Sequence, residues 1–249
     1  MIATIARHEL RRLFLSPLAW SVLAILQLVL AYIFLINIDR FIARQAELAL
    51  LPQAPGATLL VAVQLVASIP ILLLVVAPLI SMRLLSDERR LQTRVLLLSA
   101  PLRMYQIVLG KYLALVLFFT LLWVLQALML LSLGLGTGLD LGHIASALLA
   151  FYLLILVVTA VGIYMSSLTS QPAIAAMASF GLLMLLWIVD SGAQVEQADS
   201  LLTHLSMSHH YQSLLTGVVG VVDVGYFLLV SGLFIVLTVA RLHRERVYA

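Results

Sequence analysis

Long stretches without any Asp, Glu, Lys or Arg divide this sequence, and they limit what the chain can fold into. A helix needs about 20 apolar residues to cross the roughly 30 Å of hydrocarbon in a bilayer. With 63% hydrophobic and only 10% charged residues, the chain is predicted to be an integral membrane protein rather than a soluble domain. The uncharged intervals are Leu13–Ile38, Leu48–Met82, Tyr112–Leu139, Leu141–Val189 and Val224–Ala240.

The fourth interval is long enough for two helices. The polar segment SSLTSQP (166–172) lies near its middle, and a proline such as Pro172 is favoured at the first position of a helix. We therefore predict an all-α integral membrane fold with six transmembrane helices in a single domain (1–249). The expected spans are Leu18–Ile38, Leu59–Ser81, Tyr112–Leu133, Ala145–Met165, Pro172–Val189 and Val219–Val239.

The basic residues predict how the chain is oriented, because short cytoplasmic loops are enriched in Lys and Arg. On one side of the predicted spans only Arg40 and Arg44 occur, whereas the other side has twelve of the 14 basic residues. Both termini are therefore expected in the cytoplasm. The twelve are Arg7, Arg11, Arg12, Arg83, Arg89, Arg90, Arg94, Arg103, Lys111, Arg241, Arg244 and Arg246.

Short helices are expected outside the spans. Residues 1–16 have an apolar face opposite their arginines, which predicts an interfacial helix, and Ser16 with Pro17 can begin span 1. On the far side, 190–222 should form short extracytoplasmic helices before span 6 (219–239). In that segment His204, His209 and His210 could bind a metal, but their spacing fits no standard zinc pattern. We favour a hydrated interfacial histidine group and assign no metal site.

The stretch SDERRLQTRVLLLSAP (86–101) concentrates charge between spans 1–2 (18–81) and spans 3–5 (112–189). Ser86 could cap a helix whose first turn holds acidic residues. The helix should end before Pro101, because the residue preceding a proline is disfavoured in the helical region. We expect a cytoplasmic helix of about 12 residues that offers one face to a partner.

The same stretch carries a family resemblance. Glu88-Arg89, Thr93, Leu97-Leu98-Ser99 and Pro101, followed by Gly110-Lys111, resemble the signature of type-two ABC exporter permeases, the membrane subunits of ABC transporters. Residues 162–190 and 217–246 look like the gliding-motility-associated subgroup, a relative of which serves nitrous oxide reductase maturation.

The resemblance implies six spans, an interfacial amino-terminal helix and a cytoplasmic coupling helix, in a bacterial inner membrane. It implies an ATPase subunit as partner, in two copies, and a second permease, which is either the same chain or a sister chain. Gly110 and Lys111 belong to the family motif. The expected ATPase-coupling interface consists of Asp87, Glu88, Arg89, Arg90, Thr93, Arg94, Leu97 and Pro101.

The chain lacks a phosphate-binding loop of its own. Lys111, the single lysine, follows Gly110 but precedes Tyr112 instead of the Ser or Thr that such a loop requires. ATP and Mg should therefore bind the partner ATPase, so this chain is predicted to be a transport subunit without a cofactor, a catalytic residue or a nucleic-acid partner. We interpret Lys111 as the charged end of span 3 at the headgroups.

Other functions are compatible with this sequence. A secondary transporter or channel normally places ionisable groups at membrane depth, and such groups are scarce in these spans. An anchor that passes the state of an ATPase to another protein, without moving a substrate, stays open because fold does not fix function. For an exporter, the apolar spans slightly favour an amphiphilic cargo.

Overall fold

Helices account for the regular structure of the residues that are described. The computed structural model describes residues 1–45, 56–90, 103–136, 138–189 and 204–247. Helix formation suits apolar segments in a bilayer, because each backbone polar group finds its partner within the segment. The elements are α1 (Ile2–Leu15), α2 (Pro17–Ala43), η1 (Thr58–Val63), α4 (Gln64–Ser81), α5 (Arg83–Arg90), α7 (Met104–Ser132), η2 (Leu133–Leu135), α8 (Leu141–Leu168), α9 (Pro172–Ile188), α11 (Met207–Leu215) and α12 (Val221–Val247).

Within the described residues, 5 helical stretches are long and apolar enough to cross a membrane. The fifth predicted span, Pro172–Val189, corresponds to α9, an apolar helix of 17 residues, which extends over about 25 Å at 1.5 Å per residue. The chain is thus a multi-pass membrane protein, and a membrane crossing by α9 stays a prediction. The five stretches are Pro17–Ala43, Thr58–Asp87, Met104–Leu135, Leu141–Leu168 and Val221–Glu245.

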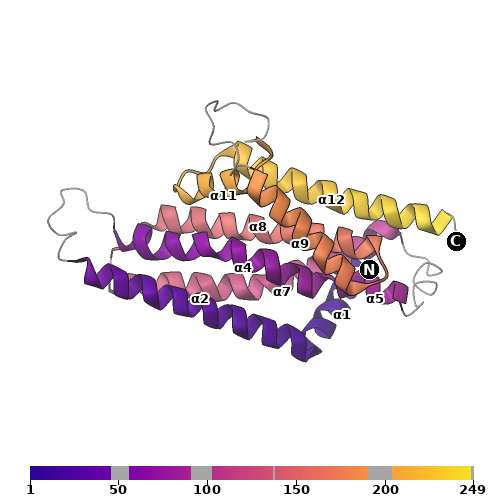
Figure 1. Ribbon diagram of the computed structural model, residues 1–249, viewed down its shortest axis with the longest axis horizontal. Helices are drawn as coiled ribbons and strands as arrows, with labels where there is room; N and C mark the ends of the chain where they lie inside the picture. The colour runs from indigo at the N-terminus through magenta and orange to yellow at the C-terminus, as the bar shows by residue number, and fades with distance from the viewer. Residues whose placement is uncertain (46–55, 91–102, 137, 190–203, 248–249) are drawn as a thin grey trace.

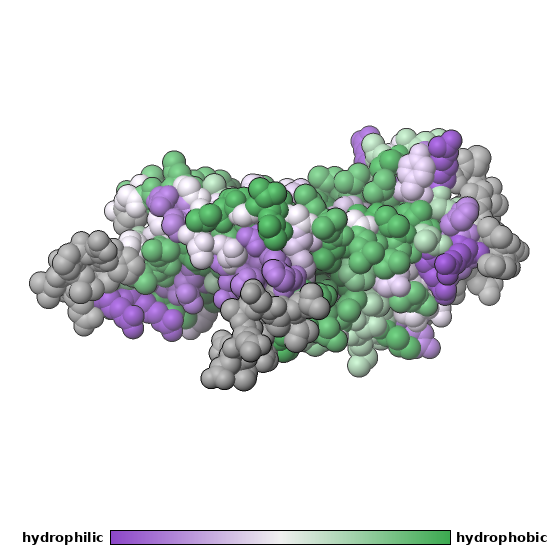
Figure 2. Space-filling model, turned by 90° about the horizontal axis from the view of Figure 1, so that it is seen from above, coloured by the Kyte–Doolittle hydropathy of each residue, from purple (hydrophilic) through white to green (hydrophobic). Residues whose placement is uncertain are grey.

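Helix α8 forms the centre of the bundle. It packs against α4, α7, α9 and α12, and it is the most deeply buried of the five candidate spans. The start of α1, the whole of α5 and the end of α12 lie at one end of the bundle (Figure 1), which we call the termini end. Figure 2 shows broad hydrophobic areas on one face, with hydrophilic side chains gathered toward both ends and near the middle.

The predicted helix boundaries are right in one case and wrong in two others. Helix α2 begins at Pro17 with Ser16 as its N-cap residue, as expected. Helix α7 begins at Met104 rather than Tyr112, because Lys111 lies inside the helix in a buried ion pair and does not mark its end. Helix α12 likewise continues past Val239 to Val247, since its last turns are polar and extend beyond the hydrophobic stretch.

Candidate functional site

The predicted coupling segment begins in α5, at the termini end. Ser86 was expected to cap this helix, but α5 starts three residues earlier, at Arg83. Ser86 lies inside the helix, and its hydroxyl donates to the carbonyl of Met82 one turn before. The predicted residues Asp87, Glu88, Arg89 and Arg90 belong to α5. The others lie outside the described residues: Thr93, Arg94, Leu97 and Pro101.

A serine of α8 fixes the start of α5. The first backbone N–H groups of a helix have no partner within the helix. The hydroxyl oxygen of Ser166 accepts hydrogen bonds from the N–H groups of Leu85 (3.0 Å) and Ser86 (3.1 Å). The same hydroxyl donates to the carbonyl of Met82 at 2.8 Å. One buried side chain thereby attaches the junction between α4 and α5 to the central helix.

Lys111 of α7 attaches α5 to two more helices. Its Nζ lies 2.6 Å from Oε1 of Glu9 in α1 and donates to the carbonyl oxygen of Leu84 in α5 at 2.9 Å. Only 1% of Lys111 is exposed, so the expectation of a lysine at the headgroups is wrong. A charge that leaves water needs an opposite charge and hydrogen bonds to offset its desolvation, and Glu9 supplies that charge.

Gly110 allows the close approach that this ion pair requires. A Cβ atom at Gly110 would lie 2.7 Å from Cγ2 and 2.8 Å from Cβ of Ile5, distances that side-chain atoms cannot tolerate. A glycine here lets α1 lie directly on α7. The two residues of the Gly110-Lys111 motif therefore act together to hold α1 against α7.

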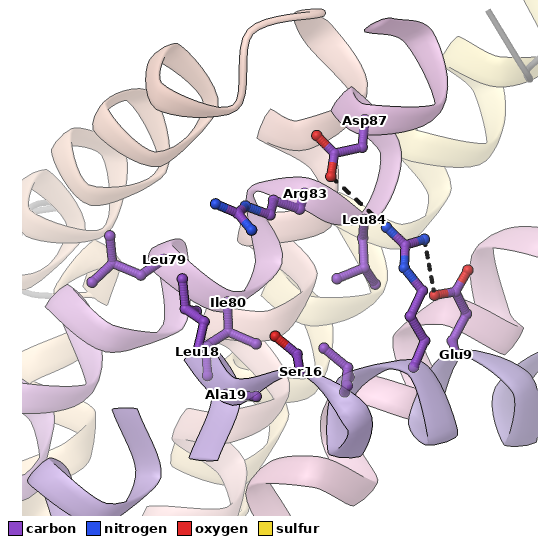
Figure 3. A pocket seen from close by; sticks show the side chains of 11 residues that line it. Glu9, Ser16, Leu18, Ala19, Leu79, Ile80, Arg83, Leu84 and Asp87 are labelled. Atoms are coloured by element: carbon purple, nitrogen blue, oxygen red, sulfur yellow. Dashed lines mark ion pairs between the residues drawn. The ribbon is translucent and has the colours of Figure 1, made fainter. Parts of the chain in front are cut away.

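Arg12 connects α1 directly to the expected docking helix. Its guanidinium lies 3.7 Å from Glu9 and 3.8 Å from Asp87 of α5. These residues line a pocket of about 130 Å³ between α1, α2 and the α4–α5 junction, and Arg83 also lines it (Figure 3). Because Arg12 is half-exposed, solvent screens its ion pairs and each contributes little to stability.

Helix α11 contacts α4 where the backbone of α4 lacks one of its own hydrogen bonds. Pro70 lies inside α4 and has no N–H to donate to the carbonyl of Val66. The hydroxyl of Tyr211 in α11 donates to that carbonyl at 2.8 Å. Burial raises the pKa of Tyr211 well above its ordinary value, so the hydroxyl keeps its proton and stays a donor.

The histidines of this region differ from the hydrated group that we expected. His204 and His209 are exposed, but His210 is buried. Its Nδ1 lies 2.7 Å from Oδ1 of Asp223 in α12, and its ring stacks on that of Tyr226. Within the described residues, no three His, Cys, Asp or Glu side chains form a group that could hold a metal. His210 thus joins α11 to α12.

The arrangement at the termini end can transmit force. Helix α5 is bonded to α8 through Ser166, to α7 through Lys111 and to α1 through Arg12. A displacement of α5 therefore acts on three helices at once. The sequence reasoning missed Glu9 and Ser166. Glu9 is the one acidic residue among the arginines of 2–15, and that isolation was a usable signal.

Comparisons with known proteins agree with this architecture. The family described as "ABC-2 family transporter protein" matches residues 3–245, nearly the whole chain. Among curated proteins, none matches it.

Proposed function

This chain belongs to the ABC-2 family of transporter proteins, and on that premise we propose that it is the permease subunit of an ATP-driven exporter. The family is one of transport subunits that associate with an ABC ATPase. The observation that carries the proposal is the attachment of α5 to three helices, because a docking site must pass the partner's movement into the bundle. The single permease domain (1–249) would have six spans, with α9 as the fifth.

The ATPase docks on the segment that starts with α5. Closure of two ATPase subunits around ATP, and their opening after hydrolysis, displaces α5. The contacts of Leu84 with Lys111 and of Leu85 with Ser166 transfer that displacement to α7 and α8. The bundle then moves between two arrangements, one open to each side. ATP and Mg bind the partner, since the sequence has no phosphate-binding loop.

The orientation follows the basic residues. The described arginines of α1 and α5, together with Arg103, Arg241 and Arg244, belong to the termini end. Because short cytoplasmic segments are enriched in Lys and Arg, this distribution supports a cytoplasmic termini end in a bacterial inner membrane. Two permease subunits and two ATPases complete the transporter around a two-fold axis. The second permease is this chain or a sister chain.

The proposal is tested by purifying the tagged chain gently from its host membranes, identifying the bound proteins by mass spectrometry and assaying ATP hydrolysis. We expect an ATPase in equal copy number. The double change Glu88→Ala and Arg89→Ala should release it. The control is Asp39→Ala, which removes an exposed charge at the opposite end of the bundle. Equal retention of the ATPase by both variants would show that α5 is not the docking site.

A further inference from the structure

A second pocket lies at the end of α2 farthest from α1. Its volume is about 190 Å³. It opens between the last turns of α2 and the first turns of the helix formed by η1 and α4, which begins as a π-helix, and π-helical turns are frequent at functional sites. Its lining residues are Asn37, Arg40, Phe41, Arg44, Leu60 and Gln64.

Asn37 lines this pocket and has an unused hydrogen-bond donor. The residue is 4% exposed, and its Nδ2 is buried without a hydrogen-bond partner. A buried amide that lacks a partner is costly to the folded state, and most such groups are satisfied by protein or by a bound molecule. A rotation of the Asn37 amide toward the pocket would let an oxygen acceptor of a ligand satisfy this donor.

Two arginines extend the same face of α2. Arg40 and Arg44 are four residues apart, so their side chains lie one above the other. Both line the pocket, and within the described residues no carboxylate lies within ion-pair distance of either. Asp39 is adjacent in sequence but lies about 100° around the helix. Two cations and a neutral donor around one cavity form a site for an anion with several oxygen atoms.

The helix dipoles add little net charge to the pocket. The carboxyl end of α2 carries a partial negative charge, whereas the amino end of the η1–α4 helix carries a partial positive one, and these oppose each other. Leu60 and Gln64 come from that amino end. The two arginines therefore give the pocket a net positive charge.

The depth of the pocket matches the phosphate layer of a bilayer. From Pro17 to Asn37 α2 rises about 30 Å, which equals the thickness of the hydrocarbon core. Asn37 then lies at the boundary of the core, and Arg40 and Arg44 lie in the headgroup layer beyond it. Phe41 and Leu60 provide apolar walls. Such a site can accept a headgroup while the acyl chains stay in the hydrocarbon.

We infer that this pocket binds the phosphate group of an anionic phospholipid. Arg40 and Arg44 hold the phosphate oxygens, and Asn37 Nδ2 donates to an oxygen of the same headgroup. The inference rests on these residues and the length of α2, and it does not require ATP coupling or the assigned orientation.

Native mass spectrometry of the full chain in detergent tests this inference, with dioleoyl phosphatidylglycerol as the probe and dioleoyl phosphatidylcholine as the neutral comparison. Wild type should bind one phosphatidylglycerol that Arg40→Gln with Arg44→Gln weakens about tenfold or more. The matched control is Arg7→Gln with Arg11→Gln, two exposed arginines four apart on α1, which should leave that lipid bound. Equal binding of phosphatidylcholine, or retention of the lipid by the Arg40 and Arg44 variant, would overturn the inference.

The variant Asn37→Leu distinguishes a role of Asn37 in lipid binding from a role in the stability of the fold. Because it removes an unpaired buried donor, its melting temperature without lipid should be at least that of wild type, while its lipid affinity falls. A lower melting temperature with unchanged affinity would give Asn37 a structural role only and contradict the site. Soluble glycerol 1-phosphate distinguishes the source of the phosphate. If it binds as tightly as phosphatidylglycerol, the assignment to a lipid is wrong and the pocket takes a free phosphate ester.

Discussion

Lys111 Nζ lies 2.6 Å from Glu9 Oε1, and this buried pair joins residues 102 positions apart in the chain. Lys111 also reaches the carbonyl of Leu84. The amino-terminal helix α1 is thus bonded to α7 at the point where α7 meets the expected docking helix.

Loss of either charge of this pair should destabilise the protein strongly. Lys111→Met leaves the carboxylate of Glu9 with only the half-exposed Arg12 at 3.7 Å as a cation, and the expected cost is up to about 3–5 kcal/mol. The melting temperature of the purified chain in detergent measures it. The double change Glu9→Leu and Lys111→Met should recover more than half of the loss, because no unpaired charge remains. If the double variant loses as much stability as the two single variants together, Glu9 and Lys111 do not interact as an ion pair.

Gly110→Ala should push α1 away from α7. The new Cβ would meet the side chain of Ile5 at 2.7 Å, and overpacking of this kind costs about 1–3 kcal/mol. Adding Ile5→Ala should restore most of the stability. The control is Gly181→Ala in α9, where an added Cβ meets nothing within 4 Å, and it should be neutral or slightly stabilising. Equal effects of the two alanines would refute the close approach.

Ser166→Ala should loosen the start of α5. It leaves the N–H groups of Leu85 and Ser86 without an acceptor, and we expect a cost of about 1–3 kcal/mol. Hydrogen exchange of these two amides should accelerate. Ser167→Ala is the matched control, since the hydroxyl of Ser167 bonds only within α8, to the carbonyl of Tyr164. Unchanged exchange in α5 would contradict the attachment to α8.

Tyr211→Phe should remove the hydrogen bond that replaces the one Pro70 cannot make in α4. The carbonyl of Val66 loses its donor, at a cost of about 1–3 kcal/mol, and α11 should exchange its amides faster. Pro70→Ala restores a backbone N–H that can reach Val66, so Tyr211→Phe should cost less in that background. Tyr32→Phe, at an exposed position of α2, controls for the loss of a hydroxyl. If Tyr211→Phe costs the same stability with and without Pro70→Ala, the hydroxyl of Tyr211 does not compensate for the proline.

The sequence predicts the long helices well, because runs of apolar residues without charge have few alternatives in a membrane. The start of α2 at Pro17 follows from local chemistry alone, since Ser16 and Pro17 suit the first positions of a helix. The helix around Ser86 begins earlier than predicted, because its first N–H groups are satisfied by Ser166 of another helix and need no local cap.

Contacts between distant residues could not be predicted in this way. Nothing within ten residues of Lys111 identifies Glu9 as its partner, and burial of the pair depends on how α1 packs on α7. The bond between Tyr211 and Val66 is similar, although Pro70 signals that some donor is needed. The prediction for Thr93, Arg94, Leu97 and Pro101 stays a prediction, as these residues lie outside the described ranges.

The most direct test of the account is a cross-linking measurement at α5 in the intact complex. The chain has no cysteine, so Asp87→Cys introduces one defined thiol, and loss of the half-exposed ion pair with Arg12 should cost little. The control is Leu135→Cys, at a residue of η2 that is 94% exposed and lies just beyond the far end of α7. We predict that a short thiol-to-amine cross-linker joins Asp87→Cys to an ATPase subunit, with a yield that changes when ATP is added, and that Leu135→Cys gives no such product. An active complex in which Asp87→Cys captures no ATPase would contradict the claim that α5 begins the docking site.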